Sequence, residues 1–257
     1  MNSPNLPDVG GDPRRLIRLT AVHNFRDLGG YPTVDGRTTR WRTLFRADGL
    51  HRLGGADLEV VRELGLRTVI DLRSDGELAE RGTFPHGEHP VAFHHVPIVD
   101  STWQHLDRAV DDDAVAFLEW AYHDMLHQGP HRFVQAIEQL SAPEALPAVF
   151  HCAAGKDRTG VLAMLLLGSL GVAHDYIVAD YALTEGGITR MLAWAEQEAP
   201  EMFARLSEAP AAFMAAIPEA MTRVIATICD GGTIRDYTLG LGVSQAALAR
   251  LGAALLE

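Results

Sequence analysis

The stretch 151–160 reads HCAAGKDRTG, and its residue types and spacing suit the chemistry of a phosphate monoester. Cys152 and Arg158 are separated by five residues, of which the first three are small. Such a loop can curl so that its backbone N–H groups point inward at an anion. The same dipoles would stabilise a thiolate, because the pKa of a cysteine in such settings falls to about 3.5–7.5. The planar guanidinium can bind two phosphate oxygens at once.

This pattern predicts a two-step reaction that needs no metal or other cofactor. Cys152 would attack phosphorus to form a phosphocysteine, which water would then hydrolyse. A carboxyl group would protonate the leaving oxygen and then activate the water. Thr159 would donate its hydroxyl to the departing sulfur. The predicted phosphate-binding residues are Ala153, Ala154, Gly155, Lys156, Asp157, Arg158 and Thr159.

The flanking residues place this loop between a strand and a helix. Residues 146–150 form a short apolar run close to prolines, which is typical of a buried strand. Residues 160–171, GVLAMLLLGSLG, are typical of a buried helix that ends at Gly171. A helix N-terminus would add its positive dipole to the anion site. This context makes an inert buried Cys152 the less favoured interpretation.

The chain resembles the bacterial atypical protein-tyrosine and lipid phosphatases from about residue 20 to its end. The Gly-Lys-Asp-Arg core of the loop separates that family from the ordinary tyrosine phosphatases. Further similar blocks are HNFRDLGG (23–30), LFRADGLHRL (44–53), VIDLRSDGE (69–77), IVADYALT (177–184) and GLGVSQAALARL (240–251). The resemblance implies hydrolysis of phosphotyrosine, often extending to phosphoserine, phosphothreonine and phosphoinositides. It also implies that Asp157 serves as the acid or base.

Two aspartates compete for that role. The ordinary tyrosine phosphatases carry their acid on a separate loop marked Trp-Pro-Asp, and this sequence has no such tripeptide. Its absence favours Asp157. The alternative is Asp71, at the end of a predicted strand, where it and Arg73 would face the same crevice. An ion pair or helix cap without a catalytic role explains Asp71 and Arg73 equally well.

Several other polar residues admit a functional and a structural interpretation. His151 would support the nucleophile. Arg26 would hold the catalytic loop or reach the substrate, although we favour a structural tie between the N-terminal segment and the core. Lys156 would suit phosphoinositides, or would simply pair with a neighbouring carboxylate. The histidines at 86, 89, 94 and 95 match no zinc pattern, so we predict no metal site.

The composition restricts the classes of partner and compartment. The 257 residues are 47% hydrophobic and 22% charged, as in ordinary globular proteins. A formal net charge of −12 argues against a nucleic-acid partner. The longest apolar run, 161–170, is too short to span a bilayer, and residues 1–16 lack the apolar core of a signal peptide. A free Cys152 implies a reducing compartment, so we expect a cytoplasmic protein. The resemblance leaves export without a signal peptide open.

Strand and helix patterns alternate in the first part of the chain and predict an α/β fold. Strands are expected at 41–47, 67–72 and 91–98, and helices at 55–64, 74–81, 114–126 and 132–140. After Gly171 every pattern is helical. We therefore expect a tyrosine-phosphatase-like, mostly parallel sheet with helices on both faces and a helical C-terminal half. Residues 1–19 are expected to be a disordered segment, residues 20–257 a single phosphatase domain, and the acidic stretch 100–113 a solvated loop.

The main hypothesis is a cysteine-dependent phosphomonoesterase acting on protein phosphotyrosine, with inorganic phosphate as product and competing inhibitor. The alternative is the same mechanism on a phosphoinositide. A catalytically silent phosphate-binding module is disfavoured because Cys152 and Arg158 are both present. A sulfur-transfer enzyme or arsenate reductase is disfavoured because such enzymes use further cysteines, and only Cys229 remains.

Overall fold

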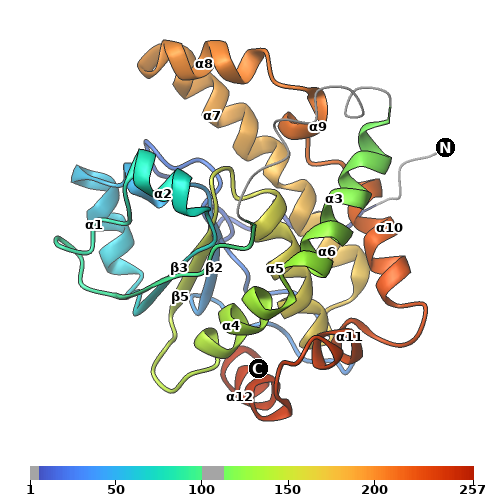
Figure 1. The fold of residues 1–257 in the computed structure, drawn as a ribbon. Helices are drawn as coiled ribbons and strands as arrows, with labels where there is room; N and C mark the ends of the chain where they lie inside the picture. The colour runs from blue at the N-terminus through green and yellow to red at the C-terminus, as the bar shows by residue number, and fades with distance from the viewer. Residues whose placement is uncertain (1–5, 100–112) are drawn as a thin grey trace.

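The computed structural model describes residues 6–99 and 113–257, with a five-stranded sheet at the centre (Figure 1). Across the sheet the strands follow the order β1-β2-β5-β3-β4. Their bounds are β1 Arg26–Asp27, β2 Leu44–Ala47, β3 Thr68–Asp71, β4 Ala92–His95 and β5 Ala148–His151. Neighbouring strands are parallel except for β1 with β2. The predicted mostly parallel sheet is confirmed, and the unpredicted β1 is too short to show alternation.

The helices form a first group between the strands and a second group that follows β5. The first group comprises a 3₁₀ turn η1 (Leu50–Arg52), α1 (Gly55–Glu63), α2 (Asp75–Arg81), α3 (Ala114–Gln128) and α4 (Pro130–Leu140). The second comprises α5 (Asp157–Ser169), α6 (His174–Ala182), α7 (Thr184–Glu198), α8 (Pro200–Ser207), α9 (Ala211–Met214), α10 (Pro218–Ile228), α11 (Ile234–Gly240) and α12 (Gln245–Leu255). The helical C-terminal half is thereby confirmed. Of the acidic stretch, 100–112 lies outside the described residues, and Asp113 caps α3.

Hydrophobic cores lie on both faces of the sheet because side chains alternate along each strand. Val69 and Val149 pack into a smaller core together with Val61 of α1. Ile70 and Phe150 pack into a larger core with α3, α4, α5 and the later helices. The strands are thus covered on both sides, as a parallel sheet requires.

Helix α5 runs through the larger core, and nearly all of its side chains are buried. It packs against α3, α6 and α11 and against strands β2 and β5. Its continuous apolar sequence is explained by this position, since a helix enclosed on all sides needs no polar face. Because α5 is fixed so firmly, the loop before it is held at a defined place.

The N-terminal segment packs on the domain over the part that the structure describes, residues 6–19. Val9 and Arg15 are buried. The guanidinium of Arg15 donates to the carbonyl oxygen of Asp27 at 2.5 Å and lies 4.0 Å from the ring centroid of Tyr31. These contacts could not be predicted from the Pro- and Gly-rich sequence of the segment, because a single buried arginine produces no periodic pattern.

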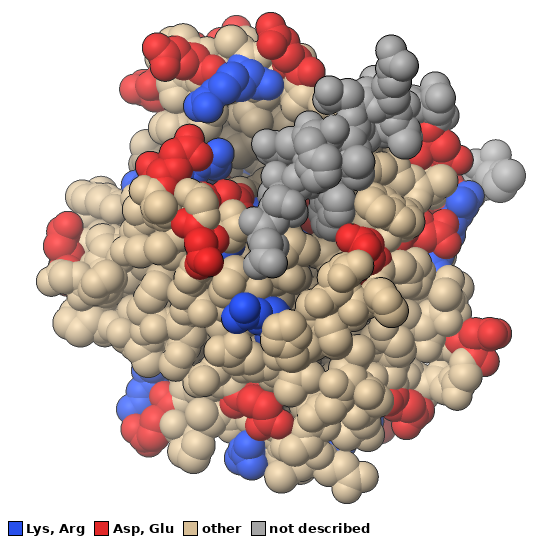
Figure 2. All heavy atoms as spheres, in the orientation of Figure 1, with Lys and Arg blue, Asp and Glu red and all other residues tan. Residues whose placement is uncertain are grey.

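Helices α7, α8 and α9 lie over the carboxyl ends of the parallel strands. Figure 1 shows α7 and α8 extending above the sheet near α2. Pro200 opens α8, where its missing N–H costs nothing because the first turn of a helix leaves that group unpaired. Acidic side chains are spread over the surface in Figure 2, as the net charge of −12 leads us to expect.

Candidate active site

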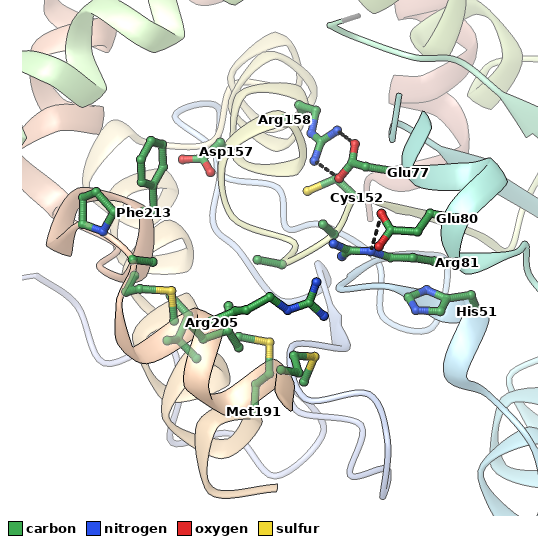
Figure 3. Close-up of a pocket in the computed structure, with 18 of the residues that line it drawn as sticks. His51, Glu77, Glu80, Arg81, Cys152, Asp157, Arg158, Met191, Arg205 and Phe213 are labelled. Atoms are coloured by element: carbon green, nitrogen blue, oxygen red, sulfur yellow. Dashed lines mark hydrogen bonds and ion pairs between the residues drawn. The ribbon is translucent and has the colours of Figure 1, made fainter. Parts of the chain in front are cut away.

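The loop 152–156 connects β5 to α5 at the floor of a cavity of about 610 Å³. Cys152 is only 2% exposed and lines this cavity together with Ala153, Ala154, Asp157 and Arg158. Figure 3 shows the sulfur pointing into the space between α2 and α8. The structure thus brings together the residues that the sequence predicted as nucleophile, guanidinium and carboxyl group.

Gly155 gives the loop its curvature. Its φ of +66° lies in the left-handed region that favours glycine. A Cβ at this position would meet the carbonyl oxygen of Ala47 at 2.5 Å, so the loop passes directly against the end of β2. Both observations restrict this position to glycine.

Arg158 is oriented by two parallel hydrogen bonds to Glu77 of α2. Its Nη1 and Nη2 donate to the carboxylate oxygens at 2.5 and 2.9 Å (Figure 3). Burial opposes the ionisation of Glu77, but the guanidinium outweighs it and lowers the pKa of Glu77 to about 2. Burial likewise disfavours charged Arg158, but Cys152 and Glu77 raise the pKa of Arg158 above its usual value. Arginine has five N–H donors, so this pairing leaves three for an anion.

Glu77 is a site residue that the sequence reasoning missed. It is the third residue of α2, and its carboxylate accepts from the backbone N–H of Ser74 at 2.9 Å in a capping box. The spacing Ser-x-x-Glu could have revealed the cap. The contact with Arg158 joins residues far apart in sequence, so no local sequence pattern predicts it.

Asp157 stands at the wall of the cavity and is one-quarter exposed. Its Oδ1 accepts a hydrogen bond from the hydroxyl of Tyr122 at 2.7 Å and forms an ion pair with Nζ of Lys156 at 2.9 Å. The Tyr122 hydroxyl also lies 2.6 Å from the hydroxyl of Tyr181. The carboxylate is therefore anchored through one oxygen at the edge of the site.

The side chain of Lys156 points away from the anion site. It is buried and donates to the carbonyl oxygen of Ala212, in α9, at 2.9 Å, besides its pairing with Asp157. This geometry agrees with the interpretation that Lys156 pairs with a neighbouring carboxylate. It does not support direct contact of its ammonium group with a phosphoinositide.

Asp71, Arg73 and His151 form a buried group behind the strand ends, outside the lining of the cavity. Arg73 donates to Asp71 from Nε at 2.9 Å and from Nη2 at 2.5 Å. Burial raises the pKa of Asp71, but His151 and Arg73 outweigh it and lower this pKa to about 2. An aspartate that stays ionised and enclosed is poorly suited to donate a proton to a leaving group, so this arrangement favours the ion-pair interpretation.

Two predicted contacts take a different form in the structure. The buried hydroxyl of Thr159 makes no hydrogen bond with any residue that the structure describes, so the expected contact with the sulfur is not formed. Burial lowers the pKa of His151, and its Nδ1 lies 3.2 Å from the carbonyl oxygen of Cys152. His151 therefore contacts the loop at the carbonyl group of Cys152.

Arg26 lies behind the catalytic loop and does not line the cavity. Its Nε donates to Asp180 of α6 at 3.0 Å, and Arg46 of β2 donates to the same carboxylate at 2.6 Å. The favoured interpretation of Arg26 as a tie to the core agrees with this geometry. Arg46, Asp180 and the neighbouring Asn24 were not singled out from the sequence, although each lies in one of the similar blocks.

The upper wall of the cavity comes mainly from the segment that contains α7, α8 and α9, which the sequence did not connect with the site. Its apolar members are Ile188, Met191, Met202, Leu206, Ala209, Pro210, Phe213 and Met214, and Val99 after β4 adds to them. The charged residues Arg52, Glu80, Arg81, Arg205 and Glu208 also line it. The side chain of Arg205 reaches into the space from α8 (Figure 3). A ligand here would meet a polar floor and mixed walls.

Among the described residues, no three His, Cys, Asp or Glu side chains gather as metal ligands would. Two of the four clustered histidines lie near backbone carbonyl oxygens. A ring nitrogen of His86 is 3.0 Å from the carbonyl oxygen of Phe84, and one of His95 is 2.8 Å from that of Arg73. In the same part of the chain, no helix has the length and apolar character needed to cross a membrane.

Residues 17–257 match the tyrosine phosphatase family, so the chain belongs to this family and the resemblance predicted from the sequence is confirmed. The triple specificity protein phosphatase PtpB of Mycobacterium tuberculosis is 28% identical to it, over 93% of this chain and 98% of that protein. A protein of Cupriavidus necator named as a tyrosine-protein phosphatase is 35% identical over 65% of this chain. A tyrosine-protein phosphatase of Nostoc commune is 29% identical over 71% of this chain.

The length covered differs among these relatives. The matched part of this chain spans 62% of the Cupriavidus protein and 60% of the Nostoc protein. Among solved structures, TpbA of P. aeruginosa in complex with pTyr is 16% identical, covering 77% of this chain and 99% of that one, with a TM-score of 0.32. That similarity is too small to support an argument about the site.

Proposed function

We propose that this chain is a cysteine-dependent phosphomonoesterase that hydrolyses protein phosphotyrosine. The observation that carries the proposal is the arrangement at the floor of the cavity. Cys152 lies in a curled loop at the N-terminus of α5, beside a guanidinium that gives two of its five N–H donors to Glu77 among the residues that the structure describes. This combination of nucleophile, backbone amides and Arg158 suits a phosphoryl group, which carries its charge on several oxygens.

In the first step Sγ of Cys152 attacks phosphorus, and the bond from phosphorus to the ester oxygen breaks. Asp157 gives its proton to that leaving oxygen. In the second step Asp157 takes a proton from water as the water attacks phosphorus. The phosphorus–sulfur bond then breaks and inorganic phosphate is released, which also competes with substrate. Arg158 and the loop amides bind the phosphoryl oxygens throughout.

The walls of the cavity favour an aromatic phosphate ester. Met191, Met202 and Phe213 provide apolar, adaptable surface above Cys152. A tyrosine ring would bury its faces against these side chains while its phosphate reached the loop. A short phosphoserine side chain would place its peptide backbone deep in the same apolar space, so we expect phosphotyrosine to be preferred.

Phosphoinositides are the second candidate substrates, and Arg81 and Arg205 favour them. Both guanidinium groups line the cavity, and the ion pair of Arg81 with Glu80 is long, at 3.9 Å. They lie where the additional phosphates of an inositol ring would need countercharge. A panel of phosphotyrosine peptides and inositol lipids separates the two substrates through kcat/KM. A much higher value for the lipids would reverse our ranking.

The first test is the hydrolysis of p-nitrophenyl phosphate in EDTA by the wild type and by Cys152→Ser. We expect activity in the wild type and none measurable in the variant, since a serine hydroxyl in the same loop is a far weaker nucleophile at neutral pH. Full activity in Cys152→Ser, or a wild type without activity, would contradict the proposal.

The proposal extends to the organisation and location of the protein. We take residues 20–257 as one phosphatase domain, supported by the single large core that the sheet shares with the C-terminal helices. Reduced Cys152 is essential to the mechanism, so we place the protein in a reducing compartment such as the cytoplasm. We propose no nucleic-acid partner and no resident cofactor.

A further inference from the structure

Three consecutive carbonyl groups of the catalytic loop are held from behind by donors on other segments. The carbonyl oxygen of Ala153 accepts from the backbone N–H of Gly49 at 3.0 Å. The next one, of Ala154, accepts from Nδ2 of Asn24 at 2.9 Å. The carbonyl oxygen of Gly155 accepts from Nη2 of Arg46 at 2.7 Å and from the Asn24 amide at 3.2 Å.

These bonds determine where the loop N–H groups point. In a planar trans peptide the C=O and the N–H point in opposite directions. Holding the carbonyls of residues 153, 154 and 155 on the rear side therefore turns the N–H groups of residues 154, 155 and 156 to the other side. Cys152, Ala153 and Ala154 line the cavity, so we infer that this other side of the loop is the one that faces it. The donors thus position amides that the proposed function uses for phosphate.

Arg46 and Asn24 belong to a buried charge network. Arg46 is 1% exposed and also donates from Nη1 to Asp180 at 2.6 Å. Arg26 donates to the same carboxylate, and its Nη1 forms a short hydrogen bond with the side-chain oxygen of Asn24. Tyr31 donates its hydroxyl to Asp180 at 2.7 Å. Two guanidinium groups share one carboxylate, so the network carries a net positive charge beneath the loop.

That charge persists at neutral pH. Burial and the neighbouring Arg26 lower the pKa of Arg46, while Asp180 opposes them, and the result is a pKa of about 10. Burial opposes ionisation of Asp180, but Arg26 and Arg46 outweigh it and keep its pKa well below the usual value. A buried positive charge is screened little by solvent, so it stabilises an anion in the loop above it.

We propose that Arg46 and Asn24 are positioning residues that hold the anion-binding conformation of the catalytic loop and favour the thiolate of Cys152. The inference rests on the proposed function, because the loop is taken to bind phosphate. It concerns the conformation of the loop and not the identity of the substrate. Neither residue lines the cavity, so they act through the loop peptides and through charge.

The test compares three variants with the wild type. In Arg46→Lys the ammonium group retains the charge but cannot reach both Asp180 and Gly155 with the same geometry. In Asn24→Asp the shape and the acceptor for Arg26 remain, while the donor to the loop is lost and a carboxylate stands against the loop carbonyls. The matched control is Arg235→Lys, since Arg235 is partly buried and also donates to a backbone carbonyl, that of Ser169 at 3.0 Å, at the end of α5 far from the loop.

Two readouts do not require turnover. The pH dependence of iodoacetamide alkylation at Cys152, followed on its own peptide by mass spectrometry, gives the thiol pKa. Protection of Cys152 by inorganic phosphate gives the anion affinity. We expect Arg46→Lys and Asn24→Asp to raise the thiol pKa by about one pH unit and weaken phosphate binding about tenfold or more. Arg235→Lys should lower Tm but leave both quantities at wild-type values.

Each outcome decides the inference. Wild-type thiol pKa and phosphate affinity in folded Asn24→Asp would overturn it, even if Arg46→Lys failed to fold. Equal shifts in Arg235→Lys would also overturn it, because general destabilisation would then explain the effect. A wild type without phosphatase activity would contradict the proposed function, whereas the alkylation data would still decide whether these residues position the loop.

Discussion

Asp157 and Asp71 differ in what surrounds their carboxylates, and that difference separates their roles. Asp157 lines the cavity and is anchored through Oδ1 by Tyr122 and Lys156. Asp71 is fully buried and accepts hydrogen bonds from both Nε and Nη2 of Arg73. The first geometry suits proton transfer at an open site. The second suits a fixed ion pair that holds the strand ends.

We therefore expect Asp157→Asn to lower kcat by about 10²–10⁴-fold, since it removes the acid and base. The loss should be smaller for p-nitrophenyl phosphate than for phenyl phosphate, because nitrophenolate leaves more easily without a proton. Steady-state kinetics with both esters measures this difference. An equal loss for both esters would argue that Asp157 only shapes the loop.

Asp71→Asn should behave differently. It leaves the Arg73 charge buried and unpaired, which costs about 3–5 kcal/mol of stability. Folded protein should still turn over substrate with the leaving-group dependence of the wild type. Urea unfolding and kinetics on the folded fraction provide the comparison. A folded but inactive Asp71→Asn variant would instead favour Asp71 as the general acid.

The turn from β5 through the loop into α5 is the element that defines the site. Its strand is fixed between β2 and β3, and its helix is buried on all sides, so the loop cannot relax by moving its ends. Gly155, at a φ of +66°, provides the change of chain direction between the strand and the helix. A substitution that Gly155 cannot accommodate must therefore change the conformation of the loop itself.

Gly155→Ala is expected to distort the loop, because its Cβ would lie 2.5 Å from the carbonyl oxygen of Ala47. We expect a loss of about 1–3 kcal/mol in stability and at least a tenfold loss of phosphate affinity. Thermal unfolding and phosphate inhibition measure the two effects. The control is Gly54→Ala, where φ is −172° and a Cβ would meet no atom within 4 Å. Equal effects at both positions would contradict this account.

At the scale of the whole molecule, carboxylates link separate elements through ionic contacts. Glu77 joins α2 to α5 through Arg158. Asp71 of β3 pairs with the nearby Arg73 and lies 3.6 Å from Nε2 of His151 in β5. The pKa of each carboxyl is lowered to about 2, from ordinary values of 4.5 and 3.8. Their folded forms bind fewer protons than the unfolded chain, so these contacts stabilise the fold above about pH 4.5.

The free energy of unfolding should therefore fall as the pH decreases from about 4.5 to 2. Glu77 alone should account for about 2 kcal/mol of this decrease. Urea titrations at a series of pH values measure the slope, and Glu77→Gln should reduce it. An unchanged slope in Glu77→Gln would show that the contact with Arg158 does not contribute to acid stability.

The sequence predicted helices and strands well wherever apolar residues recur at a regular spacing. The strands and helices expected between residues 41 and 140 lie within a few residues of the observed ones, because apolar periodicity reports directly on burial. The two-residue β1 has no period to detect. The contributions of α7, α8 and α9 to the cavity depend on how helices fold back over the sheet, which periodicity does not encode.

The sequence by itself determined the nucleophile, the guanidinium and the strand–loop–helix turn, because these lie within ten contiguous residues whose chemistry depends on spacing along the chain. Only the tertiary structure decided the partner of Arg158, the side on which Lys156 lies and the donors behind the loop. Glu77, Ala212 and Arg46 come from separate elements, and packing alone brings them to the site. Hydrogen bonds across such separations leave no pattern in one chain, since each needs only a single residue at the correct place in space.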